Sequence, residues 1–270
     1  MAATRDGAPR PRRRLLHTSD VHLGRFEGDT EAVRREESHA VFSQVLDAGI
    51  ALNVDGLIIA GDFFDNARVR PDTLEFAATE IARFDRPVVI GPGNHDHFGK
   101  NSVYERYPYG DVRNLQIIRD PEGETVRLDG LDIEVWGKAH TEAYTAFEPF
   151  DLTPPRGEAP WQIGVGHGHY IHPQALLHHS FHIREAHLVA SERDYIALGH
   201  WDRMTRVAAG DRTIAAYSGC PEGLAQRHGG WVMLVDLMED GSVRLTAHPL
   251  GEEPGSRTTR SRSSRGSRSS

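Results

Sequence analysis

Aliphatic runs and helical patterns alternate along the first third of the chain. Residues 15–18 form a short run that leads into small polar residues, and residues 31–52 place apolar side chains at helical spacing. A buried-strand pattern follows at 57–60, a second helical pattern at 72–84 and another strand pattern at 87–90. This repetition predicts an α/β fold, in which ligands bind at the carboxyl ends of the strands.

Closely spaced strand patterns replace this alternation in the second half of the chain. Asp-Gly pairs at 129–130 and 240–241 are typical of hairpin turns. The predicted strands lie at 115–118, 124–128, 131–136, 161–166, 194–198, 204–208, 213–217, 231–237 and 243–247. One more helix is predicted around 183–192. The whole pattern predicts two packed sheets flanked by helices in one domain.

The two ends of the chain differ from the part between them. Residues 1–13 and 251–270 are poor in apolar residues and rich in Arg, Ser, Gly and Pro, a composition typical of disorder. We therefore expect a disordered basic arm at 1–13, a single domain at 14–250 and a disordered Arg/Ser-rich tail at 251–270. The tail is either a basic interaction arm or a solvated extension.

The distribution of charge along the chain limits the kinds of partner that the protein can bind. The formal net charge of the 270 residues is −8, although both ends are basic, so the domain itself is acidic. An acidic domain disfavours tight non-specific binding to nucleic acid, because Lys and Arg make most contacts to phosphate. Any nucleic-acid substrate would therefore be held locally, by metal ions or by a partner protein.

Targeting and redox signals indicate the cytoplasm. No stretch approaches the roughly 18 consecutive apolar residues of a membrane-spanning helix, and the first residues lack the apolar region of a signal peptide. Cys220 is the single cysteine, which excludes an internal disulfide and a cysteine zinc cluster. We expect a cytoplasmic protein without a membrane partner.

Five short polar clusters stand out, each directly after a predicted strand. They are Asp20-x-His22, Gly61-Asp62-x-x-Asp65, Gly93-Asn94-His95-Asp96, Gly166-His167-Gly168-His169 and Gly199-His200-x-Asp202. Each cluster alone is weak, because such tripeptides arise by chance and a Gly-Asp pair after a strand is usually a turn. Five of them at strand ends predict a metal centre, since carboxylate, imidazole and carboxamide groups suit Mn²⁺, Fe²⁺ and Zn²⁺. A bridging carboxylate can hold two such ions about 3.5–4 Å apart.

The ordered clusters resemble the motifs of the calcineurin-like metallophosphoesterases, from about residue 14 to residue 220. The flanking residues 16–24, 92–96, 195–200 and 217–221 look like the DNA-repair exonuclease branch, the SbcD-like nuclease subunits that work with an SMC-type ATPase. The resemblance implies a four-layer α/β/β/α sandwich of two mixed sheets flanked by helices. It also implies phosphodiester hydrolysis, in DNA as substrate, by two divalent ions, Mn²⁺ first with Fe²⁺ or Zn²⁺ as alternatives.

The resemblance also implies a role for each matching residue. Asp20 and His22 would bind the first metal, and Asp62 would bridge both metals. The second metal would be bound by Asn94, His167 and His200. Catalysis would involve His95, which stabilises the transition state or protonates the leaving oxygen, and Asp96, which orients the imidazole of His95.

One position departs from the family pattern. The family has Gly-His-x-His where this chain has Gly199-His200-Trp201-Asp202, so an aspartate replaces the last histidine ligand of the first metal. We predict that Asp202 ligates that metal, since carboxylates bind Mn²⁺ and Fe²⁺ well. The opposing interpretation is that Asp202 faces solvent and the first site has three protein ligands.

Two other functions compete with that of a DNA nuclease subunit. One is a phosphodiesterase or phosphatase for a small nucleotide or another small phosphoester. The other is a non-catalytic accessory subunit of an SMC-like ATPase, in which the substitution at Asp202 has removed the first metal. In the loops after the second and third clusters, Arg68, Arg70 and Tyr104 are either substrate contacts or ordinary loop residues.

Overall fold

The structure is a computed structural model that describes residues 10–25, 31–128, 130–141, 146–171, 181–222 and 230–250, with backbone alone at 31–36. Of the predicted disordered segments, the tail at 251–270 and residues 1–9 of the arm lie outside the described residues. Residues 10–13, which were predicted to belong to the disordered arm, lie against the domain. Arg10 pairs with Asp194 at 2.9 Å, and the indole N–H of Trp161 donates to the carbonyl of Pro11 at 2.7 Å. These polar contacts hold the segment against the domain.

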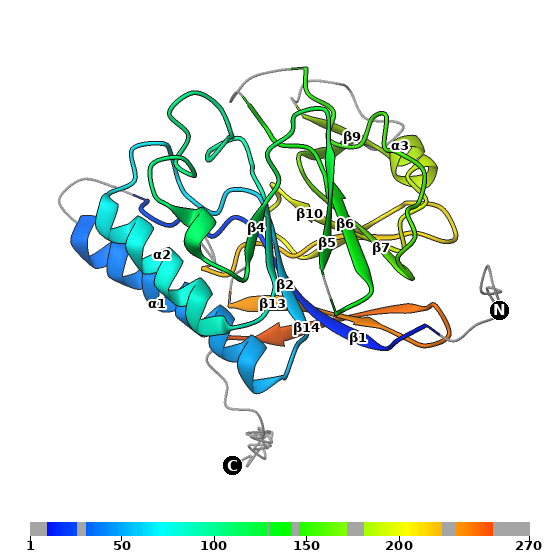
Figure 1. Cartoon of the computed structure of the whole chain (residues 1–270), viewed down its shortest axis with the longest axis horizontal. Coiled ribbons are helices and arrows are strands. Elements are labelled where there is room, and N and C mark those ends of the chain that lie inside the picture. Colours follow the sequence, from blue (N-terminus) through cyan, green and yellow to red (C-terminus); the bar gives the residue numbers. More distant parts are fainter. Residues whose placement is uncertain are drawn as a thin grey trace, which may run out of the picture.

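Two six-stranded mixed sheets form the centre of the protein (Figure 1). The first sheet has the order β14 (Val243–Pro249), β13 (Trp231–Leu237), β1 (Arg13–Thr18), β2 (Gly56–Ala60), β3 (Val88–Gly91), β4 (Leu115–Ile117). The second has the order β11 (Thr205–Val207), β12 (Ile214–Tyr217), β10 (Tyr195–Gly199), β7 (Trp161–His167), β6 (Ile133–Gly137), β5 (Glu124–Leu128). Strands β1 to β4 are mutually parallel, as are β6, β7, β10 and β12.

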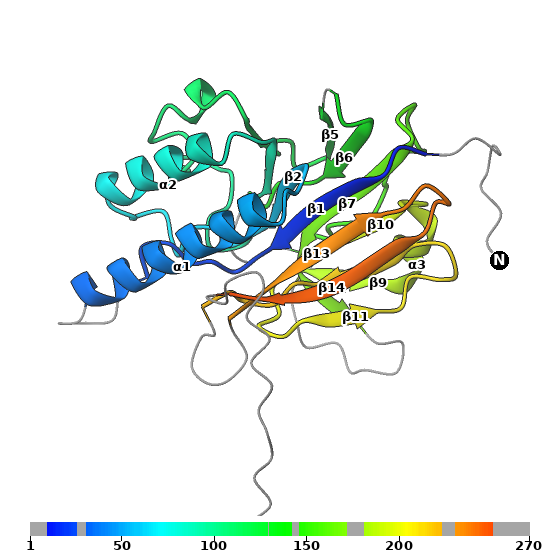
Figure 2. The same cartoon turned by 90° about the horizontal axis from the view of Figure 1, so that it is seen from below.

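Helices cover the outer faces of the sheets (Figure 2). The helices α1 (Glu31–Ala51) and α2 (Pro71–Phe84) pack on the first sheet, and α3 (Glu185–Ala190) lies beside the second. A 3-10 helix, η2 (Tyr109–Asp111), precedes β4. The predicted four-layer α/β/β/α sandwich is thereby confirmed. None of the described helices is both long and apolar enough to cross a membrane.

Alternating side chains on each strand divide the core into three clusters. On β1, Leu15 packs between the sheets, whereas Leu16 packs under the helices of the first sheet. On β10, Ala197 points between the sheets and Ile196 points to the outer cluster near α3. Because strand side chains alternate faces, strands covered on both sides read as continuous apolar runs. This explains why runs such as 57–60 contain no polar residue.

The predicted elements match the observed ones to within a few residues. A small two-stranded sheet of β8 (His169–Ile171) and β9 (His182–Arg184) was not predicted. Each of these strands has three residues and includes a histidine, so neither contains the apolar run that marked the longer strands.

Candidate metal centre

The carboxyl ends of five parallel strands meet at one edge of the two sheets. Asp20, Asp62 and Asn94 follow β1, β2 and β3 of the first sheet. His167 is the last residue of β7, and His200 follows its parallel neighbour β10 in the second sheet. Direct hydrogen bonds join the two sheets here. The ring Nδ1 of His167 bonds the carbonyl of Ala60 at 2.9 Å, and the amide of His200 donates to Asp20 Oδ2 at 3.0 Å.

Two glycines of the clusters permit this close approach. Gly61 has a φ of +84°, and a Cβ atom there would lie 2.2 Å from Nδ1 of His167. A Cβ atom at Gly93 would lie 2.2 Å from Oδ1 of Asp62. Any larger residue would therefore push apart the loops that carry the candidate ligands.

Three non-glycine residues of these loops also have a left-handed backbone conformation. The φ angles of Asp20, His22 and Asp62 are 54°, 50° and 50°. Two backbone hydrogen bonds of 3.0 Å hold the loops together, from Asp20 N to the carbonyl of Gly61 and from His22 N to the carbonyl of Asp62. Non-glycine residues in this region cluster at functional sites, where the surrounding structure holds them in place.

Asp20, His22 and Asp62 form the first donor group. All three side chains are buried, and one donor atom from each lies within 4.8 Å of the others. The carboxylate of Asp62 is oriented by its Oδ1, which accepts the amide of His95 at 2.9 Å. Its Oδ2 lies 3.9 Å from His22 Nε2 and 3.2 Å from His167 Nε2. One carboxylate oxygen of Asp62 therefore lies between donors that come from the two sheets.

On the side of Asp62 that faces the second sheet, His167 is the direct neighbour, and the ring of His200 lies beside that of His167. Since a carbonyl only accepts, Nδ1 of His167 carries the proton in its bond to Ala60, and Nε2 faces Asp62. The rings of His167 and His200 are 5.2 Å apart and nearly perpendicular. A further histidine, His140, donates from Nε2 to the carbonyl of His167 at 2.7 Å.

Buried atoms without hydrogen-bond partners test whether this site fits a metal ion. Among the described residues, Oδ1 of Asn94 is buried without such a partner, and buried Nε2 of His167 has the ion-pair contact with Asp62 but no hydrogen bond. An unpartnered buried polar atom costs about 1–3 kcal/mol, so such atoms are rare in native proteins. A divalent cation coordinated by imidazole nitrogen, amide oxygen and carboxylate would satisfy both atoms. The donor set therefore fits the expected metal centre.

In the metal-free site His167 and Asp62 form an ion pair, so His167 has to release a proton before it can bind a metal ion. Burial disfavours charge on His167, but the adjacent Asp62 outweighs it and raises the pKa of His167 to about 10. Burial also disfavours charge on Asp62, yet His167 outweighs it and holds the pKa of Asp62 far below its usual value. Burial lowers the pKa of His200 to about 3, so its imidazole is neutral near pH 7, as a metal ligand must be.

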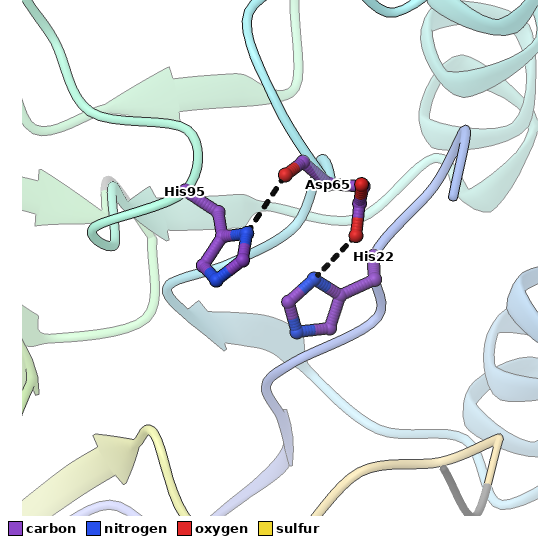
Figure 3. A group of neighbouring side chains, drawn as sticks. All are labelled: His22, Asp65 and His95. Carbon is purple, nitrogen blue, oxygen red and sulfur yellow. Dashed lines mark hydrogen bonds and ion pairs between the residues drawn. The ribbon is translucent and has the colours of Figure 1, made fainter. Parts of the chain in front are cut away.

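His95 is exposed and lies beside His22 (Figure 3). Its ring is 4.9 Å from that of His22, and its Nδ1 donates to the backbone carbonyl of Asp65 at 2.8 Å. The neutral ring therefore has its proton on Nδ1 and its lone pair on Nε2. The contact that orients His95 is this carbonyl, and not the carboxylate of Asp96.

Asp96 instead anchors the backbone of the loop that carries Asp62. It is 1% exposed, and the hydroxyl of the buried Tyr104 donates to its Oδ2 at 2.5 Å. Its two oxygens also accept the backbone N–H groups of Asp62, Phe63, Phe64 and Gly93. The prediction that Asp96 orients the imidazole of His95 is corrected accordingly. The sequence shows only that Asp96 follows His95. It does not show that five donors from other parts of the chain surround the carboxylate of Asp96.

The structure does not bring Asp202 to the other candidate ligands. Its side chain is exposed. Two groups of His and Asp side chains converge within 4.8 Å among the described residues, Asp20 with His22 and Asp62, and His22 with Asp65 and His95, and Asp202 is in neither. The predicted ligation by Asp202 thus has no geometric support, and its exposure favours the alternative in which the first site has three protein ligands. Of the possible substrate contacts, Tyr104 is buried, while Arg68 and Arg70 are exposed.

Residues after β12 form hydrogen bonds with Asp20 and with its neighbour Ser19. The hydroxyls of Ser218 and Ser19 are 3.0 Å apart, and the thiol of Cys220 donates to the backbone carbonyl of Asp20 at 3.0 Å. Neither residue was a sequence-based candidate. Their signal was indirect, since the stretch 217–221 contributed to the resemblance without a role being attached to it.

The sequence matches a protein-family model and several curated proteins. The sequence model described as calcineurin-like phosphoesterase matches residues 13–204. The chain is 27% identical over 225 residues to the DNA double-strand break repair protein Mre11 of Methanopyrus kandleri, covering 78% of this chain and 49% of that protein. It is 24% identical to the Mre11 protein of Saccharolobus solfataricus, covering 87% and 64%. The uncharacterized metallophosphoesterase YhaO of Bacillus subtilis is 28% identical, covering 69% and 48%.

Solved structures share the fold at lower identity. The crystal structure of TT1561 of Thermus thermophilus matches with a TM-score of 0.57 and 11% identity, covering 88% of this chain and 99% of that one. In contrast, the chain spans about half the length of the first curated relative.

Proposed function

Because the chain belongs to the calcineurin-like phosphoesterase family, we propose that it hydrolyses phosphodiester bonds in DNA with the help of two divalent metal ions. The observation that carries this proposal is the position of Asp62. Its Oδ2 lies between His22 of the first sheet and His167 of the second, so one oxygen faces both donor sets.

The ligand set that we propose follows this geometry. Asp20 and His22 hold the first ion, and Asp62 bridges the two ions. The second ion is held by Asn94, His167 and His200. The mixture of carboxylate, amide and imidazole donors suits Mn²⁺, with Fe²⁺ or Zn²⁺ as alternatives.

The bound ions supply Lewis acidity to the phosphoryl oxygens and lower the pKa of an attacking water. The chain itself supplies the proton donor and its orientation. The hydrogen bond from His95 Nδ1 to the carbonyl of Asp65 directs Nε2 away from that loop. When His95 is protonated, Nε2 gives its proton to the leaving oxygen of the substrate, and the imidazolium opposes the charge that develops there.

The names of the curated relatives support DNA as the substrate, whereas the negative net charge of the chain disfavours DNA binding. Curated relatives are named as DNA double-strand break repair proteins, although at 24–27% identity. The net charge of −8 disfavours independent binding to a polyanion. We therefore propose that an SMC-like ATPase partner supplies basic surface, and that the protein acts in the cytoplasm, where the free thiol of Cys220 stays reduced.

The exposure of Asp202 favours a second candidate function. With three protein ligands, the first site binds its ion more weakly than a four-ligand site. An accessory subunit that retains only the second ion would fit this arrangement. A small phosphoester is the remaining alternative, because the acidic chain would not need a long basic surface for it.

A substrate panel separates these functions. The metal-free protein would be loaded with Mn²⁺, Fe²⁺ or Zn²⁺ and assayed on single-stranded DNA, bis(p-nitrophenyl) phosphate and cyclic nucleotides. We expect turnover of DNA and the model diester, and none by Asp62→Ala. Turnover of cyclic nucleotides alone would favour a small substrate. Two bound ions without any turnover would favour the accessory role.

A further inference from the structure

His140 is a buried histidine beside the candidate centre, outside the five polar clusters of the sequence. It lies three residues after β6, a parallel neighbour of β7, which ends at His167. His140 therefore lies at the same edge of the second sheet as the candidate ligands. It is 1% exposed, so its contacts are made with the protein itself.

The imidazole of His140 holds the end of β7. Its Nε2 donates to the backbone carbonyl of His167 at 2.7 Å. The ring of His167 is held separately, because its own Nδ1 donates to the carbonyl of Ala60 at 2.9 Å. The backbone of His167 is thus fixed from the second sheet, and its ring is fixed from the first.

The backbone of His140 holds the loop after β3, which carries Asn94. The amide N–H of Phe98 donates to the carbonyl of His140 at 2.6 Å. One residue further along each loop, a Cβ atom at Gly99 would lie 2.7 Å from the carbonyl of Thr141, so the two loops are in close contact. His140 therefore contacts both the loop of Asn94 and the end of β7.

Packing alone does not explain a histidine at this position. The rings of Phe147 and Phe181 lie 4.3 and 4.7 Å from that of His140, so its surroundings are largely apolar. Nδ1 of His140 is buried there without a hydrogen-bond partner, which costs about 1–3 kcal/mol. An apolar side chain of similar size would avoid this cost but could not donate to the carbonyl of His167.

We infer that His140 is a positioning residue for the second metal ion, which fixes the end of β7 relative to the loop of Asn94. The inference rests on the proposed metal centre and adds a residue outside its ligand set. The hydrogen bond to the carbonyl of His167 fixes the backbone from which that side chain extends. Without this bond the end of β7 can move away from the loop of Asn94, and the proposed ligands no longer meet at one ion.

Metal titration of two side-chain variants tests the role of this donor. Calorimetry with Mn²⁺ on the metal-free protein would compare the wild type with His140→Met and His140→Gln. Methionine keeps the bulk but has no donor, whereas glutamine carries an NH₂ donor near the position of Nε2. We expect His140→Met to weaken one of two sites by about 10- to 100-fold, the usual effect of losing a group that holds a ligand in place. His140→Gln should restore most of that affinity.

The matched control is His39→Met, which replaces a partly buried histidine between α1 and α2. Its Nε2 lies 3.3 Å from the hydroxyl of Thr73, away from the strand ends that carry the candidate ligands. This substitution should leave both affinities unchanged.

The visible spectrum of the Co²⁺-loaded protein separates a positioning residue from a ligand. The band positions of saturated His140→Gln should equal those of the wild type, because the ligand set is unchanged. Shifted bands would identify His140 as a ligand and overturn the inference. Equal weakening in the Met and Gln variants, or wild-type affinity in both, would also overturn it while leaving the two sites of the wild type intact. A wild type that binds no metal would overturn the proposed centre and this inference together.

Discussion

Replacement of Asp96 by asparagine tests how the loop of Asp62 is held. The substitution keeps the shape of the side chain but turns one acceptor oxygen into an NH₂ donor. The Oδ1 position accepts the amides of Asp62 and Gly93 at 3.2 and 2.7 Å. The Oδ2 position accepts the amides of Phe63 and Phe64 at 2.8 and 3.1 Å, as well as the hydroxyl of Tyr104. Whichever oxygen is replaced, at least two backbone N–H groups face a donor.

The expected loss of stability follows from those bonds. A hydrogen bond to a charged acceptor contributes about 1.5–3 kcal/mol, so two lost bonds cost about 3–6 kcal/mol. The side chain is 1% exposed, so water cannot easily replace the lost acceptor. Whole domains are stable by only about 5–15 kcal/mol, and Asp96→Asn should therefore bring the metal-free protein close to unfolding.

Urea unfolding of the metal-free protein measures this loss. The midpoint of Asp96→Asn should fall while the slope of the transition stays that of the wild type. Tyr104→Phe is the matched control, since it removes one donor and leaves four amides bound. It should cost about 1.5–3 kcal/mol, clearly less than Asp96→Asn.

Two results would refute this reasoning. If Asp96→Asn unfolds within about 1 kcal/mol of the wild type, the five contacts do not stabilise the loop as their number implies. If it keeps both its stability and its metal affinity but loses turnover, Asp96 acts on His95 after all. The contact between His95 and the carbonyl of Asp65 would then not be the one that matters in catalysis.

Three further substitutions give independent tests. His95→Ala should cut turnover by about 10²–10⁴-fold with metal binding nearly intact, and loss of metal in calorimetry would identify it as a ligand instead. Asp202→Ala should leave both metal affinities unchanged because its side chain is exposed, and a weakened site would restore its predicted ligation. The metal-free protein should lose stability as pH rises from 6.5 toward 10, since the pKa of His167 is raised from 6.5 to about 10 and its charged form stabilises the fold. His167→Asn should flatten that slope in urea unfolding, and an unaltered slope would contradict the role of this charge.

Residue patterns along the chain were enough to predict the layers of the fold and the edge where the candidate ligands lie. Strands buried on both faces read as apolar runs, and helices read as amphipathic patterns, so both were visible from local order alone. The clusters after β1, β2, β3, β7 and β10 indicated the functional edge, because the carboxyl ends of parallel strands share one edge of a sheet. Asp20, Asp62 and His167 were therefore candidates before any coordinates were considered.

Which neighbours in sequence act together could not be predicted, because it depends on how distant loops pack. Asp96 follows His95 directly, yet its carboxylate turns toward the backbone of 62–64, some thirty positions earlier in the chain. The partner of His95 is the carbonyl of Asp65, and a backbone carbonyl leaves no trace in residue identity. Asp202 has suitable chemistry for a ligand but is exposed. Residue type and spacing specify what a side chain can bind, whereas packing between distant loops decides which group it meets.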